Sequence, residues 1–234
     1  MTHAGVACGF FITGTDTGVG KTLVARALLH AACAAGLRAV GMKPVAAGCR
    51  ATDAGLRNDD AEALLAAANI NARYEDVNPV ALPLATSPEI AARAAGVNIS
   101  VGDIAAAFQR LASRADCMIV EGAGGWYTPL APGLTIADVA AALNLPVVLV
   151  VPLRLGCLNH TRLSVDAIAR AGLPLAAVVI NSPESGATLP GYSESIATIA
   201  GATPSILLPH YPADDMRAAA ARVASILSRD PIER

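Results

Sequence analysis

The feature that most constrains the fold is an alternation of short, wholly apolar runs with longer alanine-rich stretches of helical character. Runs such as "VVLVV" and "AAVVI" are continuously apolar, which is typical of parallel strands that helices cover on both faces. Strands are expected at 9–13, 38–42, 117–120, 147–151, 175–180 and 205–208, and helices near 21–35, 59–68, 100–115, 135–143, 158–171, 192–200 and 213–229. The alternation predicts one α/β domain, residues 1–234, with a doubly wound, mostly parallel sheet flanked by helices.

A glycine-rich segment, "TGTDTGVGKT", joins the first expected strand to the first helix. The common phosphate-binding loop (P-loop) has four residues between its glycines, but here Gly14 and Gly20 enclose five. Because the strand–loop–helix context fits, we expect the loop N–H groups to surround the β-phosphate of ATP or GTP. Lys21 would neutralise phosphate oxygens, and the Thr22 hydroxyl would ligate Mg²⁺. The nucleotide-binding residues expected here are Thr15, Asp16, Gly18, Val19, Gly20, Lys21 and Thr22.

Ligands of such sheets bind beyond the carboxyl ends of the strands, so the residues after each strand carry the most information. Lys43 begins "KPVAAG" after the second strand, beside the expected P-loop, although lone solvated lysines are common on protein surfaces. Glu121 ends a hydrophobic strand and is followed by the glycines of "EGAGGW". A carboxylate there would bind Mg²⁺ directly or through water, the alternative being a strand-end acid in solvent.

Three acids, Asp59, Asp60 and Glu62, begin the second expected helix. Acids in a first turn complement the helix dipole, so a capping role is as natural as contact between one of them and a metal. The segment "GCLNHT" (156–161) begins a later helix, whose free N–H groups suit a carboxylate. No catalytic role is assigned to the histidine or the cysteine of this segment. The amide of Asn181, after the strand "AAVVI", could read a base edge.

The composition excludes several classes of function. The chain is 54% hydrophobic and 15% charged with a net charge of −2, which argues against a nucleic-acid partner. The mean hydropathy of +0.50 invites a membrane interpretation, but the longest apolar stretch, 139–153, contains Asn144 and Pro146 and is shorter than a bilayer span. The N-terminus lacks the basic region of a signal peptide.

The cysteines, at positions 8, 33, 49, 117 and 157, are odd in number and lack C-x-x-C spacing. We expect them to be reduced, mostly buried thiols of a cytoplasmic protein, forming neither a disulfide framework nor a zinc site.

Taken together, "TGTDTGVGKT", "KPVAAG", "RNDDA", "VNPVALPLATSP", "VEGAGGWYTPL" and "LGCLNHT" resemble the dethiobiotin synthetase family, in order, from about residue 10 to 183. The lengthened glycine spacing is itself the form that this family uses. The resemblance implies a homodimeric, ATP- and Mg²⁺-dependent cyclo-ligase of biotin biosynthesis. Its substrates would be diaminopelargonic acid and CO₂, joined through a carbamate and a carbamic–phosphoric anhydride.

The resemblance also implies residue roles. Lys21 and Lys43 would hold the carbamate and the developing phosphoryl charge, with Thr17 near the diamine. The metal ligands would be Thr22, Asp60 and Glu121. The adenine pocket would include Asn181 and Pro209. The remaining substrate contacts would be Thr86, Ser87 and Gly124, together with Gly156, Cys157, Leu158 and Asn159, which would bind the distal carboxylate across the dimer interface.

Two positions depart from the family pattern. Ala47 stands where many members have a serine hydroxyl near the phosphates, so any role of that hydroxyl is lost or moved to a neighbour. Ser182 follows Asn181 where some members have an acid, which weakens the expectation of strict adenine preference.

Three rival interpretations remain at the level of sequence. Switch ATPases of the MinD/ParA kind share the architecture but carry a second lysine early in the loop, where this chain has Thr15 and Asp16. Cobyrinic-acid amidotransferases carry a glutaminase domain that 234 residues do not accommodate. A bare nucleotide-binding module leaves "KPV" and "EGAGGW" unexplained.

Overall fold

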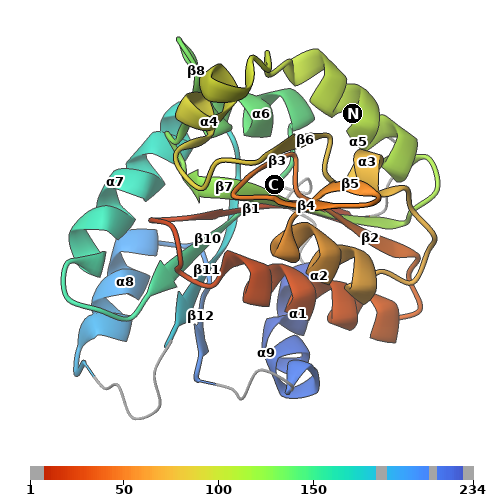
Figure 1. Ribbon diagram of the computed structural model, residues 1–234. Coiled ribbons are helices and arrows are strands. Elements are labelled where there is room, and N and C mark those ends of the chain that lie inside the picture. Colours follow the sequence, from red (N-terminus) through yellow and green to blue (C-terminus); the bar gives the residue numbers. More distant parts are fainter. Residues whose placement is uncertain (1–7, 183–188, 211–214, 229–234) are drawn as a thin grey trace.

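A six-stranded parallel sheet forms the centre of the molecule, seen in Figure 1, a computed structural model that describes residues 8–182, 189–210 and 215–228. The strand order is β12-β11-β10-β1-β7-β2, which confirms the doubly wound parallel sheet. The strands are β1 (Cys8–Gly14), β2 (Ala39–Met42), β7 (Cys117–Gly125), β10 (Val147–Pro152), β11 (Leu175–Asn181) and β12 (Ser205–Leu208). Each of the six predicted strands is present, with ends that shift by a few residues.

Helices cover both faces of this sheet (Figure 1). On one face lie α1 (Lys21–Ala34), α2 (Asp59–Ala67) and α9 (Met216–Leu227). On the other lie α5 (Val101–Ala112), α6 (Ile136–Leu143), α7 (Cys157–Arg170) and α8 (Tyr192–Ala200). The helix predicted at 213–229 corresponds to α9, and its positions 213, 214 and 229 lie outside the described residues. Position 183, where the family resemblance ends, lies outside them too.

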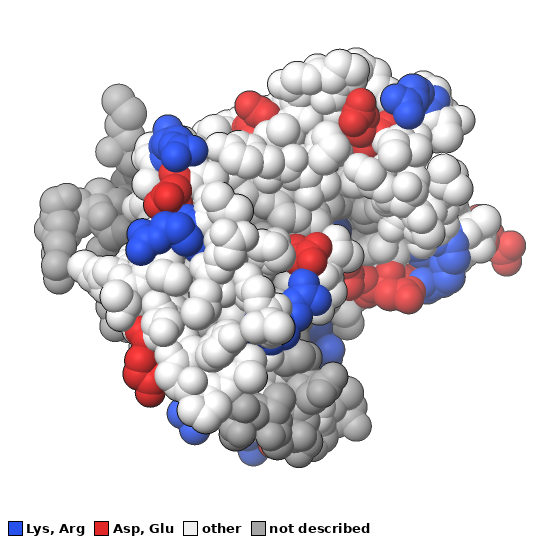
Figure 2. All heavy atoms as spheres, turned by 90° about the vertical axis from the view of Figure 1, so that its left-hand side faces the viewer, with Lys and Arg blue, Asp and Glu red and all other residues white. Residues whose placement is uncertain are grey.

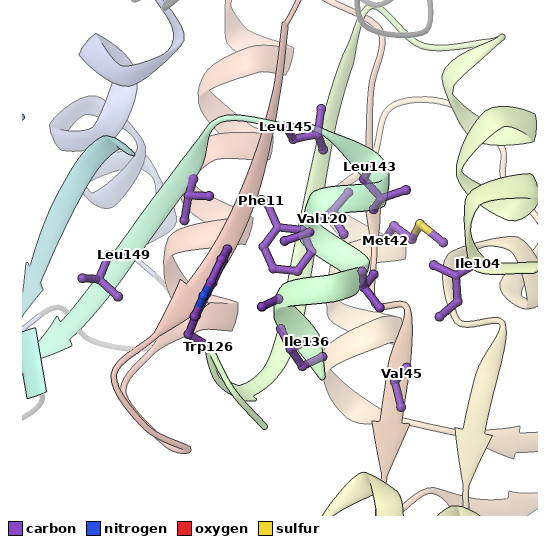
Figure 3. Packing of buried hydrophobic residues seen from close by; sticks show 14 of the residues in the cluster. Phe11, Met42, Val45, Ile104, Val120, Trp126, Ile136, Leu143, Leu145 and Leu149 are labelled. Carbon is purple, nitrogen blue, oxygen red and sulfur yellow. The ribbon is translucent and has the colours of Figure 1, made fainter. Parts of the chain in front are cut away.

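The continuous apolar strands are explained by two separate cores. Phe10 and Ile12 point into one core with α1 and α9, whereas Phe11, between them, belongs to the other. Figure 3 shows this second core, in which Phe11 and Val120 of neighbouring strands lie beside Ile136 of α6. Because successive strand residues face opposite sides, a strand covered on both faces needs apolar residues at every position.

The sequence prediction missed the small elements between the main strands. They are β3 (Val45–Ala47), β4 (Arg50–Thr52), β5 (Gly55–Arg57), β6 (Val80–Leu82), β8 (Pro129–Ala131), β9 (Leu134–Thr135), α3 (Tyr74–Val77) and α4 (Pro88–Ala95). β3 pairs with β6, β4 with β5, and β8 with β9. Most span only two to four residues, too short to show a period of 2 or 3.6 in sequence.

The expectation of five free thiols is wrong, because Cys8 and Cys117 are joined in a disulfide. They start the adjacent parallel strands β1 and β7 and stand directly opposite each other in register, with Cα atoms 4.7 Å apart. Since 109 residues separate them along the chain, only the strand pairing brings them together. Cys33, Cys49 and Cys157 are free, as expected.

The side of the molecule that carries α7 and α8 is poor in charge. Figure 2 shows this side, where blue and red side chains are scattered among large uncharged areas. The exposed apolar side chains include Leu155, just before α7, Leu163, in the middle of α7, and Tyr127, after β7. Within the residues that the structure describes, no helix is long and apolar enough to cross a membrane.

Candidate functional site

The loop between β1 and α1 has the backbone geometry of a phosphate-binding turn. Gly20, the residue before α1, has φ of 97°, a left-handed conformation that favours glycine. No side chain caps the helix start, so its N–H groups remain directed toward the loop. Lys21 folds back and donates from Nζ to the Asp16 carbonyl oxygen at 2.9 Å. The local arrangement therefore fits an anion held at a helix N-terminus.

Four of the predicted residues converge from α1, α2, the middle of β7 and the end of β2. Lys43 Nζ donates to Glu121 Oε1 at 2.6 Å and to Asp60 Oδ2 at 3.0 Å. Thr22 Oγ1 lies 2.9 Å from both Asp60 Oδ1 and Glu121 Oε1, and donates its single proton to one of these oxygens. Residues 78 and 99 positions apart along the chain thus form one compact cluster.

Glu121 differs in position from the expectation. It was predicted to end its strand, but β7 continues through the glycines to Gly125, which pairs with Gly14. Glycines let the chain stay extended next to the loop without side chains in the way. Glu121 therefore projects from within the sheet, only 1% exposed, and is not an acid in solvent.

The three acids at the start of α2 separate into two roles. Asp59 and Glu62 both form ion pairs with Arg50 of β4. Asp60 faces the other way and pairs with Lys43. Of these three acids, Asp60 is therefore the one that joins Lys43 and Glu121, and its two neighbours hold the β4–β5 hairpin against the helix.

Burial and charge set the protonation of this cluster. Burial disfavours the charge of Lys43, but the carboxylates of Glu121 and Asp60 outweigh that effect and raise its pKa. Burial likewise favours the neutral form of Asp60, and the nearby Lys43 ammonium reverses this and lowers the Asp60 pKa. Lys21 forms no ion pair with a carboxylate among the described residues, and burial, followed by repulsion from Lys43, lowers its pKa to about 8.

The cluster lies in the wall of an open cavity of about 880 Å³. The size is in the range of small-molecule sites. The predicted residues that line this cavity are Thr17, Gly18, Gly20, Lys21, Thr22, Lys43, Asp60, Thr86, Ser87, Glu121 and Gly124. Ala47, which replaces the family's serine, lines it too. Phosphate-loop, second-lysine and "TSP" residues therefore face one shared space.

Other predicted residues do not face that cavity. Thr15 and Asp16 line a separate cavity of about 320 Å³ beside α7, and Asp16 pairs there with Arg154 at 2.7 Å. Val19 is buried, and its carbonyl oxygen accepts from Asn181 Nδ2 at 2.9 Å. Pro209, after β12, and the α7 start, Gly156, Cys157, Leu158 and Asn159, line neither of these two cavities.

Sequence reasoning missed several residues near the site. Asn58, Pro88 and Thr128 line the large cavity, and Arg154 holds the loop through Asp16. The sequence marks Asn58, because an asparagine before an acidic first turn is typical of a helix N-cap. It caps α2 by accepting from the Ala61 N–H at 3.2 Å.

Solved structures with the same architecture include the MinC:MinD complex of Aquifex aeolicus, with a TM-score of 0.60, 15% identity, and coverage of 97% of this chain and 99% of that one. A ParA family ATPase from Chlorobium tepidum TLS has a TM-score of 0.55 and 15% identity, covering 97% and 94%. Identities this low show the fold alone and confirm the P-loop NTPase-like prediction. They carry no argument for a switch function.

Comparison by sequence is more specific. A family model described as an AAA domain matches residues 8–216. The ATP-dependent dethiobiotin synthetase of Xylella fastidiosa (strain 9a5c) is 55% identical over 164 residues, 70% of this chain and 73% of that protein. The ATP-dependent dethiobiotin synthetase of Cellvibrio japonicus (strain Ueda107) is 48% identical over 217 residues, 93% of this chain and 94% of that protein. At 48% identity over 93% of its length, the chain belongs to the ATP-dependent dethiobiotin synthetase family.

Proposed function

We propose that this chain is a cyclo-ligase that closes the ureido ring of dethiobiotin from diaminopelargonic acid and CO₂, at the expense of ATP. The observation that carries the proposal is Lys43, a second buried lysine held by Glu121 and Asp60 in the same cavity as the phosphate-binding loop. A lysine in that place suits a reaction in which an anionic acceptor meets the γ-phosphate.

The proposed reaction has three steps. One amine of the diamine attacks the carbon of CO₂ and loses a proton, forming a carbamate. A carbamate oxygen attacks the γ-phosphorus and ADP leaves, giving a carbamic–phosphoric anhydride. The second amine attacks the carbonyl carbon and loses a proton, the C–O bond to phosphate breaks, and the ring closes. The protein supplies placement and charge, because these steps need no covalent bond to a side chain.

The roles of the lysines follow from their positions. Lys21, at the helix start, would bind the phosphate oxygens, and Lys43 would stabilise the carbamate and the charge that develops on the transferred phosphoryl group. Thr17, which also lines the cavity, would lie near the diamine. Thr86, Ser87 and Gly124 line the same space and would contact the rest of that substrate.

Mg²⁺ fits the oxygens of Thr22, Asp60 and Glu121. The second carboxylate oxygen of Glu121, Oε2, is buried and has no hydrogen-bond partner among the described residues, as a ligand atom would. A hydroxyl and two carboxylates, with phosphate oxygens completing the shell, are a common magnesium set. When bound, the ion would neutralise charge on the phosphates. No group of three or more His, Cys, Asp or Glu side chains suitable for a metal occurs in the described part of the chain.

The nucleotide base is proposed to lie near Asn181 and Pro209. One N–H of Asn181 Nδ2 donates to the Val19 carbonyl oxygen, which leaves its second N–H and its Oδ1 acceptor for a contact with adenine. The backbone N–H groups between Thr15 and Gly20 would hold the phosphates.

We propose a homodimer in which the start of α7 serves the partner's site. The residues Gly156 to Asn159 form an uncapped helix start, suited to a carboxylate, yet they line neither cavity of their own chain described above. Leu155 beside them is 86% exposed, and Leu163 on the same helix is exposed as well. Such apolar side chains on a charge-poor face favour contact with a second copy (Figure 2).

The test is ADP release from Mg-ATP in the presence of bicarbonate and diaminopelargonic acid, with each component omitted in turn. We expect release to require the diamine and the carbon source, and dethiobiotin to appear in equal amount. ADP release that is indifferent to the diamine would exclude the ligase and favour a switch ATPase.

A further inference from the structure

A chain of buried and partly buried hydrogen bonds runs behind the site, through residues to which the proposed reaction gives no role. The backbone N–H of Asn58 donates to the Tyr74 hydroxyl at 2.7 Å. That hydroxyl donates to Asn78 Oδ1 at 3.1 Å, and Asn78 Nδ2 donates to the Lys43 carbonyl oxygen at 2.7 Å. Tyr74 is 9% exposed and Asn78 is 3% exposed.

Each end of this chain is attached to a residue of the charged cluster. At one end Asn58 is the N-cap of α2, two positions before Asp60. At the other end the Lys43 peptide is held on both sides, because its N–H donates to the Val77 carbonyl oxygen at 2.8 Å. The Lys43 ammonium donates to Asp60 of α2, so the interactions form a closed loop that begins and ends in α2.

The tyrosine ring is itself held in place. The guanidinium of Arg57, in β5, lies 4.1 Å from the centre of the Tyr74 ring. A cation over a ring face is attractive, and the contact keeps the ring from turning. Because the ring is held, its hydroxyl stays in position to accept a hydrogen bond from Asn58 and to donate one to Asn78.

We propose that Tyr74 and Asn78 are positioning residues, which fix Lys43 relative to Asp60 without contacting substrate. Neither side chain lines the large cavity, so their effect must pass through the residues that they hold. The proposal rests on the function assigned above to Lys43. It also gives a role to the asparagine of "VNPVALPLATSP", a motif whose other polar residues, Thr86 and Ser87, line the cavity.

The network includes no residue of the phosphate-binding loop. The loop meets the other members of the cluster through Thr22, whose hydroxyl lies 2.9 Å from Asp60 Oδ1 and from Glu121 Oε1. A fault in the Tyr74–Asn78 pair should therefore disturb the chemistry and the metal site, and leave ATP binding largely intact. If the pair only stabilised the fold, turnover, metal binding and ATP binding would all fall in proportion to the loss of folded protein.

The test is the Tyr74→Phe variant, which keeps the ring and removes only the hydroxyl. Because small misplacements of reacting groups are costly, we expect kcat to fall by about 10- to 100-fold. The Kd for Mn²⁺, followed by electron paramagnetic resonance, should rise about threefold or more, while the Kd for ATP stays within about twofold, since only Asp60 and Lys43 are displaced. Tyr192→Phe, on α8 away from the site, is the matched control and should change none of these quantities.

Asn78→Asp provides a second variant, in which a carboxylate replaces the amide donor that faces the Lys43 carbonyl oxygen. The same separation of kcat from ATP affinity is expected. If Tyr74→Phe leaves kcat and the Mn²⁺ Kd unchanged, or lowers ATP affinity in step with them, the positioning role is wrong. The Mn²⁺ measurement needs no turnover, so it decides the matter even if wild-type ADP release proves independent of the diamine.

Discussion

At the scale of single residues, Lys43 is the most constrained side chain of the site. Its ammonium is buried among two carboxylates, and the partner oxygen of Glu121 lies 2.6 Å away. Breaking a buried pair by removing one partner leaves a charge without compensation. Lys43 therefore matters to the stability of the site as well as to the proposed chemistry, and the two effects need separate measurements.

Lys43→Ala should lower turnover by about 10²- to 10³-fold or more, since one charge-stabilising donor is lost. ATP should still bind, because Lys21 and the loop are intact, which calorimetry with a non-hydrolysable analogue will check. The free energy of unfolding should fall by about 3–5 kcal/mol, because Glu121 loses its cation. Adding Glu121→Gln should restore stability and not turnover. Normal turnover of Lys43→Ala would refute the assigned role.

At the scale of elements, the site depends on how closely the start of α1 approaches the end of β11. A Cβ atom added to Gly20 would lie 2.2 Å from Asn181 Nδ2, which is bound to the loop at Val19. Gly18 also has positive φ, of 72°, yet a Cβ there would meet nothing within 4 Å. Substitution at Gly18 therefore tests backbone strain alone, whereas substitution at Gly20 tests backbone strain together with steric contact.

Gly18→Ala should cost only the backbone strain of a left-handed alanine, about 1–2 kcal/mol in the free energy of unfolding. Gly20→Ala should cost more and should raise the Kd for ATP at least about 10-fold, because Asn181 is pushed away and the helix start moves. Urea denaturation and equilibrium dialysis measure the two quantities. Asn181→Ala in the Gly20→Ala background should recover part of the stability. Equal effects of the two glycine variants would argue against the close approach.

At the scale of the whole molecule, the amino ends of the central strands are tied together at the edge opposite the site. Cys8 and Cys117 link β1 to β7. The carboxylate of Asp116, just before β7, accepts two kinds of hydrogen bond from Arg38, just before β2. One comes from the Arg38 guanidinium at 2.7 Å and the other from the Arg38 backbone N–H at 2.9 Å. The hydrogen bond from the Arg38 side chain has the larger effect and the one from its backbone N–H the smaller, and together they lower the pKa of Asp116 to about 2.

The Asp116 interaction predicts how stability depends on pH. A carboxyl whose pKa is about 2 when folded and about 4 when unfolded stabilises the fold above pH 4, and this contribution disappears as the pH falls toward 2. The difference in stability between wild type and Asp116→Asn should therefore be constant above about pH 5 and narrow below about pH 4. Urea denaturation at pH 6, 4 and 3 checks this, with Asp53→Asn in the β4–β5 turn as a charge control. A difference that does not change with pH would contradict it.

The sequence by itself determined the layered fold and most of the cavity wall. Continuous apolar runs specify strands covered on both faces, and their polar exits share one edge because the strands are parallel. Lys21, Thr22, Lys43 and Glu121 could be found in this way, since each follows or lies in a strand with a strong local pattern. These signals are local, because each pattern is contained in about ten residues of the chain.

Only the tertiary structure decided which residues meet across the chain. The acidic pattern alone left Asp59, Asp60 and Glu62 equivalent, and the family resemblance named Asp60; the structure supplies the physical reason, because Arg50 of the hairpin holds both Asp59 and Glu62. It paired Cys8 with Cys117 through strand register, and it assembled Tyr74 and Asn78 behind Lys43. The physical reason is the same in each case: hydrogen bonds, ion pairs and disulfides act over a few ångströms in space, and a partner tens of residues away leaves no periodic mark on the sequence.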